Sequence, residues 1–299
     1  MQRKRIPRRF WRKFTKTKLY NYIPDKWAVK IKYRNHFNKK LDLKNPQTFN
    51  EKLQWLKLYD RKPEYTTMVD KLAVKQYVAD KIGEEYIIPT LGAWDSFDEI
   101  DFDSLPNQFV LKCTHSSADT VICKDKAKFD KESAKKKLEK SLHTDYYLVS
   151  REWPYKNVPR KIIAEEYMED SETHEARDYK FFCFNGKVKC FKVDFDRFKE
   201  QHTNWYDAQL KLLPVRAKKI HNTDKTIDLP ANISKMMELA EILSMEVSFL
   251  RVDFYSIDNR IYFGELTFFP GSGLLPFNDE KWDEQMGEWL VLPCDSAVK

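Results

Sequence analysis

The sequence has no hydrophobic run long enough to cross a bilayer. Its longest apolar stretches, such as the one near 87–89, fall far short of the roughly 20 residues that a membrane helix needs. The basic N-terminus is not followed by the apolar segment of a signal peptide. With 42% hydrophobic and 14% aromatic residues, the composition is that of a globular protein. These features predict a cytoplasmic protein without a membrane span.

Paired cysteines and metal-type histidine motifs are also missing. The five cysteines are Cys113, Cys123, Cys183, Cys190 and Cys294, and no two of them form a C-x-x-C pair. The six histidines form neither an H-E-x-x-H nor an H-x-x-x-H pair. This usage argues against a disulfide framework and against a structural zinc site, and it fits a reducing cytosol.

The charge is concentrated at one end of the chain. Residues 1–40 carry 15 Lys and Arg side chains and one acid, Asp25, whereas the other 259 residues carry 38 basic and 45 acidic side chains. Phe10, Trp11 and Phe14 lie between the basic residues. This pattern favours an anionic membrane surface or a solvated tail equally, and nucleic acid less. We expect residues 1–18 to be an arm outside the catalytic core.

Local signals predict a mixture of helices and antiparallel strands. Thr48 and Glu51 form a T-x-x-E capping box at the start of an amphipathic helix. Asn185-Gly186 predicts the turn of a hairpin over 178–195, because both turn positions need positive φ. Further helices are expected from the N-cap Asp70 to Gly83, at 131–142 and at 233–245, and further strands at 87–92, 109–113, 121–123 and 162–167.

The C-terminal segment LRVDFYSIDNRIYFGELTFFPGSG carries the most specific chemistry. If 258–260 is a three-residue turn, Asp253 lies opposite Glu265, and Arg251 lies opposite Thr267. Opposite residues share a face, on which two carboxylates repel each other unless a cation separates them. Mg²⁺ prefers a few carboxylate oxygens together with substrate phosphates. The spacing leaves two interpretations open, a magnesium site or two exposed acids neutralised by arginine.

Three other features are compatible with nucleotide binding without being specific for it. Lys112 ends a strand before the polar loop 114–119, from which a lysine can reach a phosphate, although most lysines are surface charges. The small residues of 270–273 either expose backbone N–H groups to an anion or form an ordinary turn. The stretch IIAEEYMED, at 162–170, is either a core strand or a strand whose end offers backbone groups to a purine.

In this order, the motifs resemble those of the ATP-grasp superfamily. More closely, the chain resembles the TupA-like ATP-grasp family, often labelled glycosyltransferase in bacterial surface-polysaccharide loci. The matching stretches span about residues 40–295 and include NPQTFNEKLQWLKLYDRKPEY, VDKLAVKQYV, IIAEEYMED, DYKFFCFNGK and ELTFFPGSGLLPF. The resemblance implies an α+β ATP-grasp fold with four parts: a basic N-terminal arm (1–40), an N-terminal helical region (41–105), a small lid subdomain (106–168) and a C-terminal catalytic subdomain with an antiparallel sheet (169–299).

The resemblance also implies a function. ATP and Mg²⁺ would serve a carboxylate–amine ligase that forms an amide through an acyl phosphate. Its substrates would be small or glycan-linked, such as a surface polysaccharide or its precursor, and nucleic acid would not be a partner. One alternative is a glycosyltransferase, for which Asp101-Phe102-Asp103 and Asp194-Phe195-Asp196 match a D-x-D motif; we interpret both matches as incidental. Another is a degenerate module that binds ATP without turnover.

Site residues carried over from the resemblance fall into five groups. They are the phosphate contacts Lys71, Lys112 and Arg197; the adenine hinge Glu165, Glu166, Tyr167 and Met168; the magnesium ligands Asp253, Glu265 and Thr267; the oxyanion-stabilising Arg251; and the acceptor contacts Gly271 and Ser272. Two positions depart from the family pattern. Thr267 replaces a common Asn, and the loop 114–119 lacks two glycines and adds Asp119, a negative charge expected near the phosphates.

Overall fold

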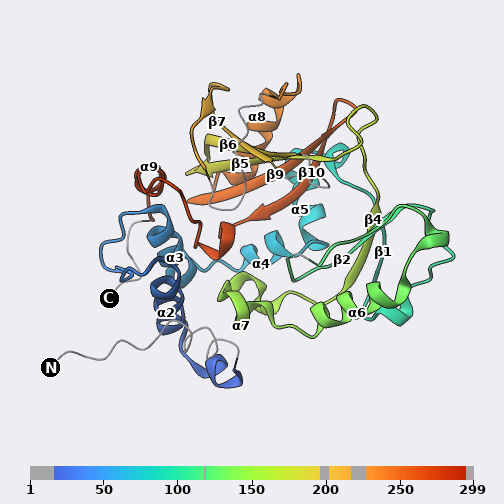
Figure 1. Cartoon of the computed structure of the whole chain (residues 1–299), viewed down its shortest axis with the longest axis horizontal. Coiled ribbons are helices and arrows are strands. Elements are labelled where there is room, and N and C mark those ends of the chain that lie inside the picture. Colours follow the sequence, from blue (N-terminus) through green and yellow to red (C-terminus); the bar gives the residue numbers. More distant parts are fainter. Residues whose placement is uncertain (1–16, 118, 196–201, 217–226, 294–299) are drawn as a thin grey trace.

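The computed structural model describes residues 17–117, 119–195, 202–216 and 227–293. Two antiparallel sheets form the body of the molecule, and helices lie between and beside them (Figure 1). The fold is therefore of the expected α+β class. Arg197 and residues 1–16 of the predicted arm lie outside the described residues. No helix within the described ranges is both long enough and apolar enough to cross a membrane.

The helices follow the predicted pattern closely. The capping box is present, because the Thr48 side chain accepts from the backbone of Glu51 while the Glu51 side chain accepts from the backbone of Thr48. The Asp70 side chain accepts from the N–H groups of Leu72 and Ala73. The next helix begins at Ala73, and its N-cap is Leu72 rather than the predicted Asp70. The α-helices are α2 (Asp25–Phe37), α3 (Phe49–Tyr59), α4 (Glu64–Val69), α5 (Ala73–Ile82), α6 (Lys131–Leu142), α7 (Tyr146–Ser150), α8 (Ile233–Ser244) and α9 (Lys281–Trp289).

Short 3₁₀ turns and strands complete the secondary structure. The 3₁₀ turns are η1 (Lys18–Tyr22), η2 (Glu84–Tyr86), η3 (Phe97–Glu99), η4 (Lys126–Lys128), η5 (Trp153–Asn157) and η6 (Pro270–Ser272). The strands are β1 (Thr90–Trp94), β2 (Phe109–Cys113), β3 (Val121–Cys123), β4 (Ile162–Glu166), β5 (Arg177–Phe184), β6 (Lys187–Phe195), β7 (His202–Asp207), β8 (Leu212–Leu213), β9 (Phe249–Ile257) and β10 (Arg260–Thr267).

The smaller sheet has the order β1-β4-β2-β3. The face of this sheet that points away from the larger sheet packs on α6 and η3, around a separate apolar core that includes Phe109, Leu111, Leu138 and Ile162 (Figure 1). The strand expected at 87–92 begins later, at Thr90, because Pro89 precedes it and lacks an N–H for the ladder. Since β1 pairs with β4, this sheet extends beyond the predicted lid boundary at residue 106.

The larger sheet has the order β10-β9-β5-β6-β7-β8. Helix α8 packs on β5, β6 and β9 from one side, and α4 contacts β10 from the side that faces the smaller sheet (Figure 1). The predicted turn at Asn185-Gly186 is present, with φ of 49° and 77°. The helices α4 and α5 thus lie between the two sheets, at the place where a site shared by both can form.

The last hairpin differs from the prediction in its turn but not in its central pairing. The turn contains two residues, Asp258 and Asn259, both at positive φ, so Arg260 is already paired with Ile257. A bulge at Gly264 then shifts the register by one residue and places Asp253 opposite Glu265. The extra residue expected in the turn lies instead in the strand.

Candidate active site

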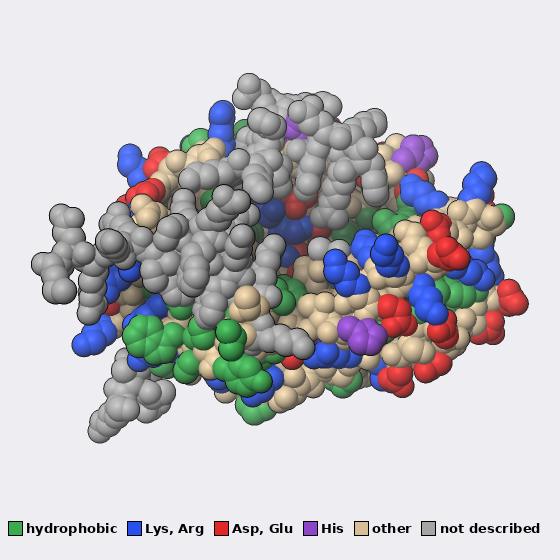
Figure 2. Space-filling view, turned by 60° about the horizontal axis from the view of Figure 1, so that its bottom comes forward, with side chains coloured by type: hydrophobic (Ala, Val, Ile, Leu, Met, Phe, Trp, Pro, Cys, Tyr) green, Lys and Arg blue, Asp and Glu red, His purple; other side chains and the backbone are tan. Residues whose placement is uncertain are grey.

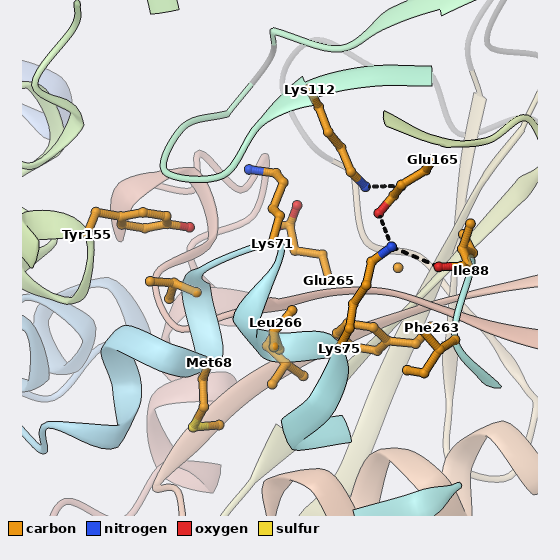
Figure 3. Close-up of a pocket in the computed structure, with 14 residues that line it drawn as sticks. Met68, Lys71, Lys75, Ile88, Lys112, Tyr155, Glu165, Phe263, Glu265 and Leu266 are labelled. Carbon is orange, nitrogen blue, oxygen red and sulfur yellow. Dashed lines mark hydrogen bonds and ion pairs between the residues drawn. The ribbon is translucent and has the colours of Figure 1, made fainter. Parts of the chain in front are cut away.

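A cavity lies where the smaller sheet, the larger sheet and helices α4 and α5 meet (Figure 3). Its lining includes residues from α4, α5, β2, β4 and β10. The lining residues are Met68, Val69, Lys71, Val74, Lys75, Ile87, Ile88, Lys112, Tyr155, Glu165, Phe263, Gly264, Glu265 and Leu266. Four residues predicted for nucleotide or metal binding, Lys71, Lys112, Glu165 and Glu265, are therefore brought to one cavity. Figure 2 shows Lys, Arg, Asp and Glu side chains in a hollow near the middle of one face.

Glu165 is the centre of an ion-pair cluster in this cavity. Its buried carboxylate accepts from Lys112 Nζ at 2.5 Å and from Lys75 Nζ at 2.7 Å (Figure 3). Burial alone would raise the pKa of Glu165, but the two lysines outweigh burial and hold it below its ordinary value. Lys112 thus lies beside β4, the strand that leads into the predicted adenine hinge.

Lys75 is a site residue that the sequence analysis missed. Besides Glu165, its ammonium contacts the carbonyl oxygen of Ile88 at 2.8 Å and Thr90 Oγ1 at 2.6 Å. Lys71 lies two residues before α5 and Lys75 lies in its first turn, and both side chains line the cavity. The four-residue spacing of the two lysines was readable in DKLAVK and was the signal that could have identified Lys75.

Lys71 is held by the loop that follows β2. Its backbone N–H donates to the Thr114 carbonyl at 3.2 Å, and its ammonium donates to the Ser116 carbonyl. Burial lowers the pKa of Lys71, and nearby Glu265 and Asp119 oppose this shift. The side chain lies beside Glu265 in Figure 3, so it can reach a ligand held at the carboxylates.

Asp119, the acid that the loop 114–119 adds, has a buried carboxylate. One oxygen of its buried carboxylate accepts from the Cys113 N–H at 3.3 Å, from Ser141 Oγ at 2.6 Å and from Ser116 Oγ. Burial raises the pKa of Asp119, but the Ser116 and Ser141 hydroxyls and Lys71 bring it below its ordinary value. The carboxylate therefore fastens this loop to helix α6.

The predicted magnesium ligands share one face of the larger sheet. Arg251 donates to both Asp253 oxygens at 2.6 Å, and its Nη2 also contacts Glu265 Oε1 at 3.1 Å. Thr267 Oγ1 donates to the same oxygen of Glu265. Both carboxylates thus reach a single nitrogen, which confirms that they lie on the same face. Within the described residues, no group of three His, Cys, Asp or Glu side chains forms a metal site.

The two acids differ in electrostatic environment. Burial raises the pKa of Asp253, and Asp178 and Glu265 add to this shift while Arg251 and Lys180 oppose it. For Glu265, burial is outweighed by Arg251 and Lys71, so its pKa lies below its ordinary value. A second cation at this place would relieve the repulsion between the two acids.

The charged face continues over three more strands. Lys180 lies opposite Asp253 on one side and opposite Lys192 on the other, and its ammonium contacts Asp194 at 3.1 Å. Lys192 contacts Asp194 at 3.0 Å, and Thr203 Oγ1 donates to Asp194 at 2.6 Å. Asp194, one half of a D-x-D match, is therefore engaged in this network, and its motif partner Asp196 lies outside the described residues.

The other predicted contacts are placed as follows. Glu166 is the exposed last residue of β4, and the hinge residues Tyr167 and Met168 follow it without regular structure. The Tyr167 hydroxyl donates to Glu169. Gly271 and Ser272 lie in η6, outside the cavity lining. The sequence left an anion site and an ordinary turn open for 270–273. The N–H groups of Ser272, Gly273 and Leu274 donate to carbonyl oxygens of the same loop, as in an ordinary turn.

A family match agrees with this geometry. The family model described as TupA-like ATPgrasp matches residues 51–291. The chain belongs to the TupA-like ATP-grasp family. Its match includes both sheets and all the cavity-lining residues, while the basic N-terminal stretch precedes it. Curated proteins yield no match.

Solved structures of several ATP-grasp ligases are similar to this TupA-like chain. An L-amino acid ligase from Bacillus licheniformis has 12% identity and a TM-score of 0.45, with coverage of 75% of this chain and 50% of the other. D-alanine–D-alanine ligase from Bacillus anthracis with ATP has 16% identity and a TM-score of 0.40, with coverage of 69% and 55%. The ATP-grasp ligase PsnB with minimal precursor, Mg and ADP has 10% identity and a TM-score of 0.42, with coverage of 96% and 75%. The chain thus spans between half and three quarters of these structures.

Proposed function

We propose that the protein is an ATP- and Mg²⁺-dependent ligase that joins a carboxylate to an amine through an acyl phosphate. The observation that carries this proposal is a cavity lined by Lys112 and Glu165 of the smaller sheet, by Glu265 of the larger sheet, and by Lys71 from the turn between α4 and α5. Cations for phosphates and carboxylates for a hard metal converge there from separate elements. In a chain of the ATP-grasp family, that arrangement fits nucleotide binding between the two sheets.

The residues on the sheet face fit a magnesium ion. Arg251 already places a positive group between Asp253 and Glu265, which shows that the pair tolerates a cation at that place. We assign Asp253 and Glu265 as ligands and Thr267 as a third oxygen. Mg²⁺, when bound, supplies neutralisation of phosphate charge. A ligand set of two carboxylates is sufficient, because Mg²⁺ completes its shell with phosphate oxygens and water.

The other residues would bind and orient the reactants. Lys71 and Lys112 would hold the phosphates as point charges. The segment Glu165–Met168 would hold the adenine edge through its backbone. Arg251 would stabilise negative charge that develops on the substrate carboxylate in the transition state. We keep Gly271 and Ser272 as acceptor contacts, with the exposed tip Gly271 as the part that can face a substrate.

For substrates, the family resemblance favours an amino acid and a uronic acid of a surface glycan or its precursor. We also propose that the basic N-terminal stretch contacts an anionic membrane surface. The described residues next to it support this, since Leu19, Tyr22 and Trp27 are 69%, 85% and 62% exposed. Exposed aromatic side chains among lysines are typical of interfacial segments.

The test of the reaction class is an isotope experiment. The enzyme is incubated with ATP, Mg²⁺ and an ¹⁸O-labelled uronic acid together with an amino acid, and the released phosphate is examined. An acyl phosphate passes one carboxylate oxygen to phosphate, so label in phosphate is expected. Turnover of a sugar nucleotide without ATP would instead support a glycosyltransferase. Tight ATP binding without ADP release for any pair would indicate a degenerate binding module.

A further inference from the structure

The loop that follows β10 has an unusual conformation. Gly271, Ser272 and Gly273 all have positive φ, at 57°, 59° and 65°. A left-handed residue other than glycine costs roughly 1–2 kcal/mol, so Ser272 needs support from its surroundings. The tip Gly271 is exposed, whereas Gly273 is buried. The loop is therefore exposed at Gly271 and packed against the protein at Gly273.

Helix α3 supplies the anchor. Gln54 Nε2 donates to the carbonyl oxygens of Ser272 and Gly273 at 3.0 and 2.7 Å. Lys57 Nζ donates to the carbonyl oxygen of Ser272 at 2.8 Å and to its hydroxyl at 3.1 Å. Gln54 and Lys57 are three residues apart, so they share one face of the helix. A Cβ at Gly273 would lie 2.5 Å from Gln54 Nε2, which shows how closely helix and loop approach.

Holding the loop with Lys57 requires the burial of a charged group, which is unfavourable. The residue is 1% exposed, and a buried ammonium loses several kcal/mol of hydration. Gln54 already bonds both carbonyls, so holding the backbone does not by itself require a charge. The charge has an electrostatic counterpart in the buried carboxylate of Glu152. The Ser272 hydroxyl accepts from Lys57 and donates to the carbonyl oxygen of Ser150 at 3.1 Å. Glu152 in turn lies within electrostatic range of Glu265.

From this arrangement we infer that Lys57 is a positioning residue of the acceptor site. Together with the carbonyl group of Ser150, it fixes the hydroxyl of Ser272, and through that residue the exposed tip at Gly271, relative to the carboxylates on the sheet. This assignment rests on the proposed ligase function, in which the tip faces the amine substrate. Lys57 itself touches no reacting atom; it acts through the loop.

A matched pair of variants separates this role from general stability. Lys57→Met keeps the length and apolar volume of the side chain and removes the ammonium. Lys52→Met makes the same change on the same helix, where Lys52 donates to the carbonyls of Gly287 and Leu290 at 2.8 Å, near the end of α9. Both variants lose partly buried hydrogen bonds, but of the two lysines only Lys57 contacts the loop.

The first measurement is hydrogen exchange on the full-length chain, which needs no substrate. Losing hydrogen bonds to a charged donor is expected to speed exchange of the Ser272, Gly273 and Leu274 amides by roughly 10- to 100-fold in Lys57→Met. In Lys52→Met these amides should exchange as in the wild type. Wild-type exchange at all three in Lys57→Met would overturn the inference, whatever the enzyme's reaction.

The second measurement is ADP release with glucuronate and a fixed panel of amino acids. For Lys57→Met we expect the KM for the amino acid to rise, or kcat to fall, by roughly 10- to 100-fold while Mg-ATP affinity stays unchanged. Lys52→Met should retain both constants. Equal losses in the two variants, or a parallel loss of ATP affinity, would refute the inference. No ADP release from the wild type counts against the ligase proposal alone, and the exchange result still decides the role of Lys57.

Discussion

Single charged side chains set the electrostatic environment of this cavity. Glu165 accepts from two lysines on different elements, Lys75 on α5 and Lys112 on β2. Because Glu165 has two ion-pair partners, either lysine can move away while the carboxylate keeps the other as a partner. An incoming phosphate can therefore recruit Lys112 while Lys75 keeps Glu165 neutralised, which is the property expected of a lysine that serves a ligand.

Replacing Lys112 tests this directly. Lys112→Met should weaken ATP binding by roughly 10- to 100-fold, because a charge-assisted hydrogen bond to phosphate is lost. The fold should persist, since Lys75 still pairs with Glu165. The control is Lys135→Met on α6, where the lysine pairs with exposed Asp98 at 2.5 Å. Calorimetric titration with ATP and Mg²⁺ measures both. Equal losses at the two positions would indicate general charge rather than a specific contact.

The metal assignment has its own prediction. Glu265→Gln should weaken the Mg²⁺-dependent part of nucleotide binding by roughly tenfold or more, as expected for a lost ligand. The side chain is 42% exposed, and Arg251 keeps both bonds to Asp253, so stability should change little. Glu238→Gln on α8 is the control, since Glu238 pairs only with exposed Lys235 among the contacts described. Nucleotide titrations of both variants with and without Mg²⁺ test the assignment of Glu265 as a ligand. An unchanged Mg²⁺ dependence in Glu265→Gln would contradict it.

At the scale of elements, the charged face of the larger sheet depends on register. Asp194 is buried between Lys180 and Lys192, which lie opposite each other on neighbouring strands. Burial raises the pKa of Asp194, but Lys192 and Lys180 reverse this and hold it well below its ordinary value of 3.8. A depressed pKa means that the ionised carboxylate stabilises the fold above about pH 4 and that this stabilisation is lost as the pH falls below it.

Asp194→Asn should therefore lower the free energy of unfolding at pH 7 by about 3–5 kcal/mol, because it breaks a buried ion pair. The difference in free energy of unfolding between the wild type and Asp194→Asn should shrink as the pH falls toward 3, because the wild type then loses the stabilisation from its ionised carboxylate. Asp98→Asn, at an exposed pair, should cost less than about 1 kcal/mol at either pH. Urea unfolding at several pH values measures the stability of the wild type and of both variants. A pH-independent difference between wild type and Asp194→Asn would contradict this account.

Sequence-based prediction succeeded for local caps and turns but reached the strand register only in part. Capping residues and the Asn185-Gly186 turn act locally, so α3, α6 and the hairpin turn could be predicted from a few neighbouring residues. The pairing of Asp253 with Glu265 was predicted through a wrong turn, because the bulge at Gly264 supplies the extra residue. Bulges depend on packing across the sheet, and the one opposite Phe182 likewise brings Lys192 opposite Lys180, which an ideal hairpin would not.

At the scale of the whole molecule, the site exists only because two sheets converge. Lys112 and Glu265 belong to different sheets and are far apart in the sequence, so no local pattern could place them together. The family resemblance supplied that order. It did not supply Lys75, or the inward turn of Asp119, because both follow from how α5 and α6 pack against the smaller sheet.

The charge asymmetry of the chain leads to a prediction about its location in the cell. Residues 1–18 contain nine Lys and Arg side chains and no acid. Each basic residue near an anionic membrane contributes about 1 kcal/mol, and salt screens this attraction. Deleting these residues should therefore reduce binding to phosphatidylserine-containing vesicles by orders of magnitude, and binding of the intact chain should fall steeply as salt increases.

Two controls separate a membrane surface from other anionic partners. Vesicles of uncharged lipid should bind neither form, and a DNA duplex should compete poorly, because aromatic side chains such as the exposed Trp27 gain energy at a lipid interface and not on a duplex backbone. Trp27→Ala should weaken vesicle binding while leaving ATP binding intact, since Trp27 lies on α2 and outside the cavity lining. Vesicle sedimentation measures each case. Undiminished vesicle binding after the deletion would show that the arm is a solvated tail.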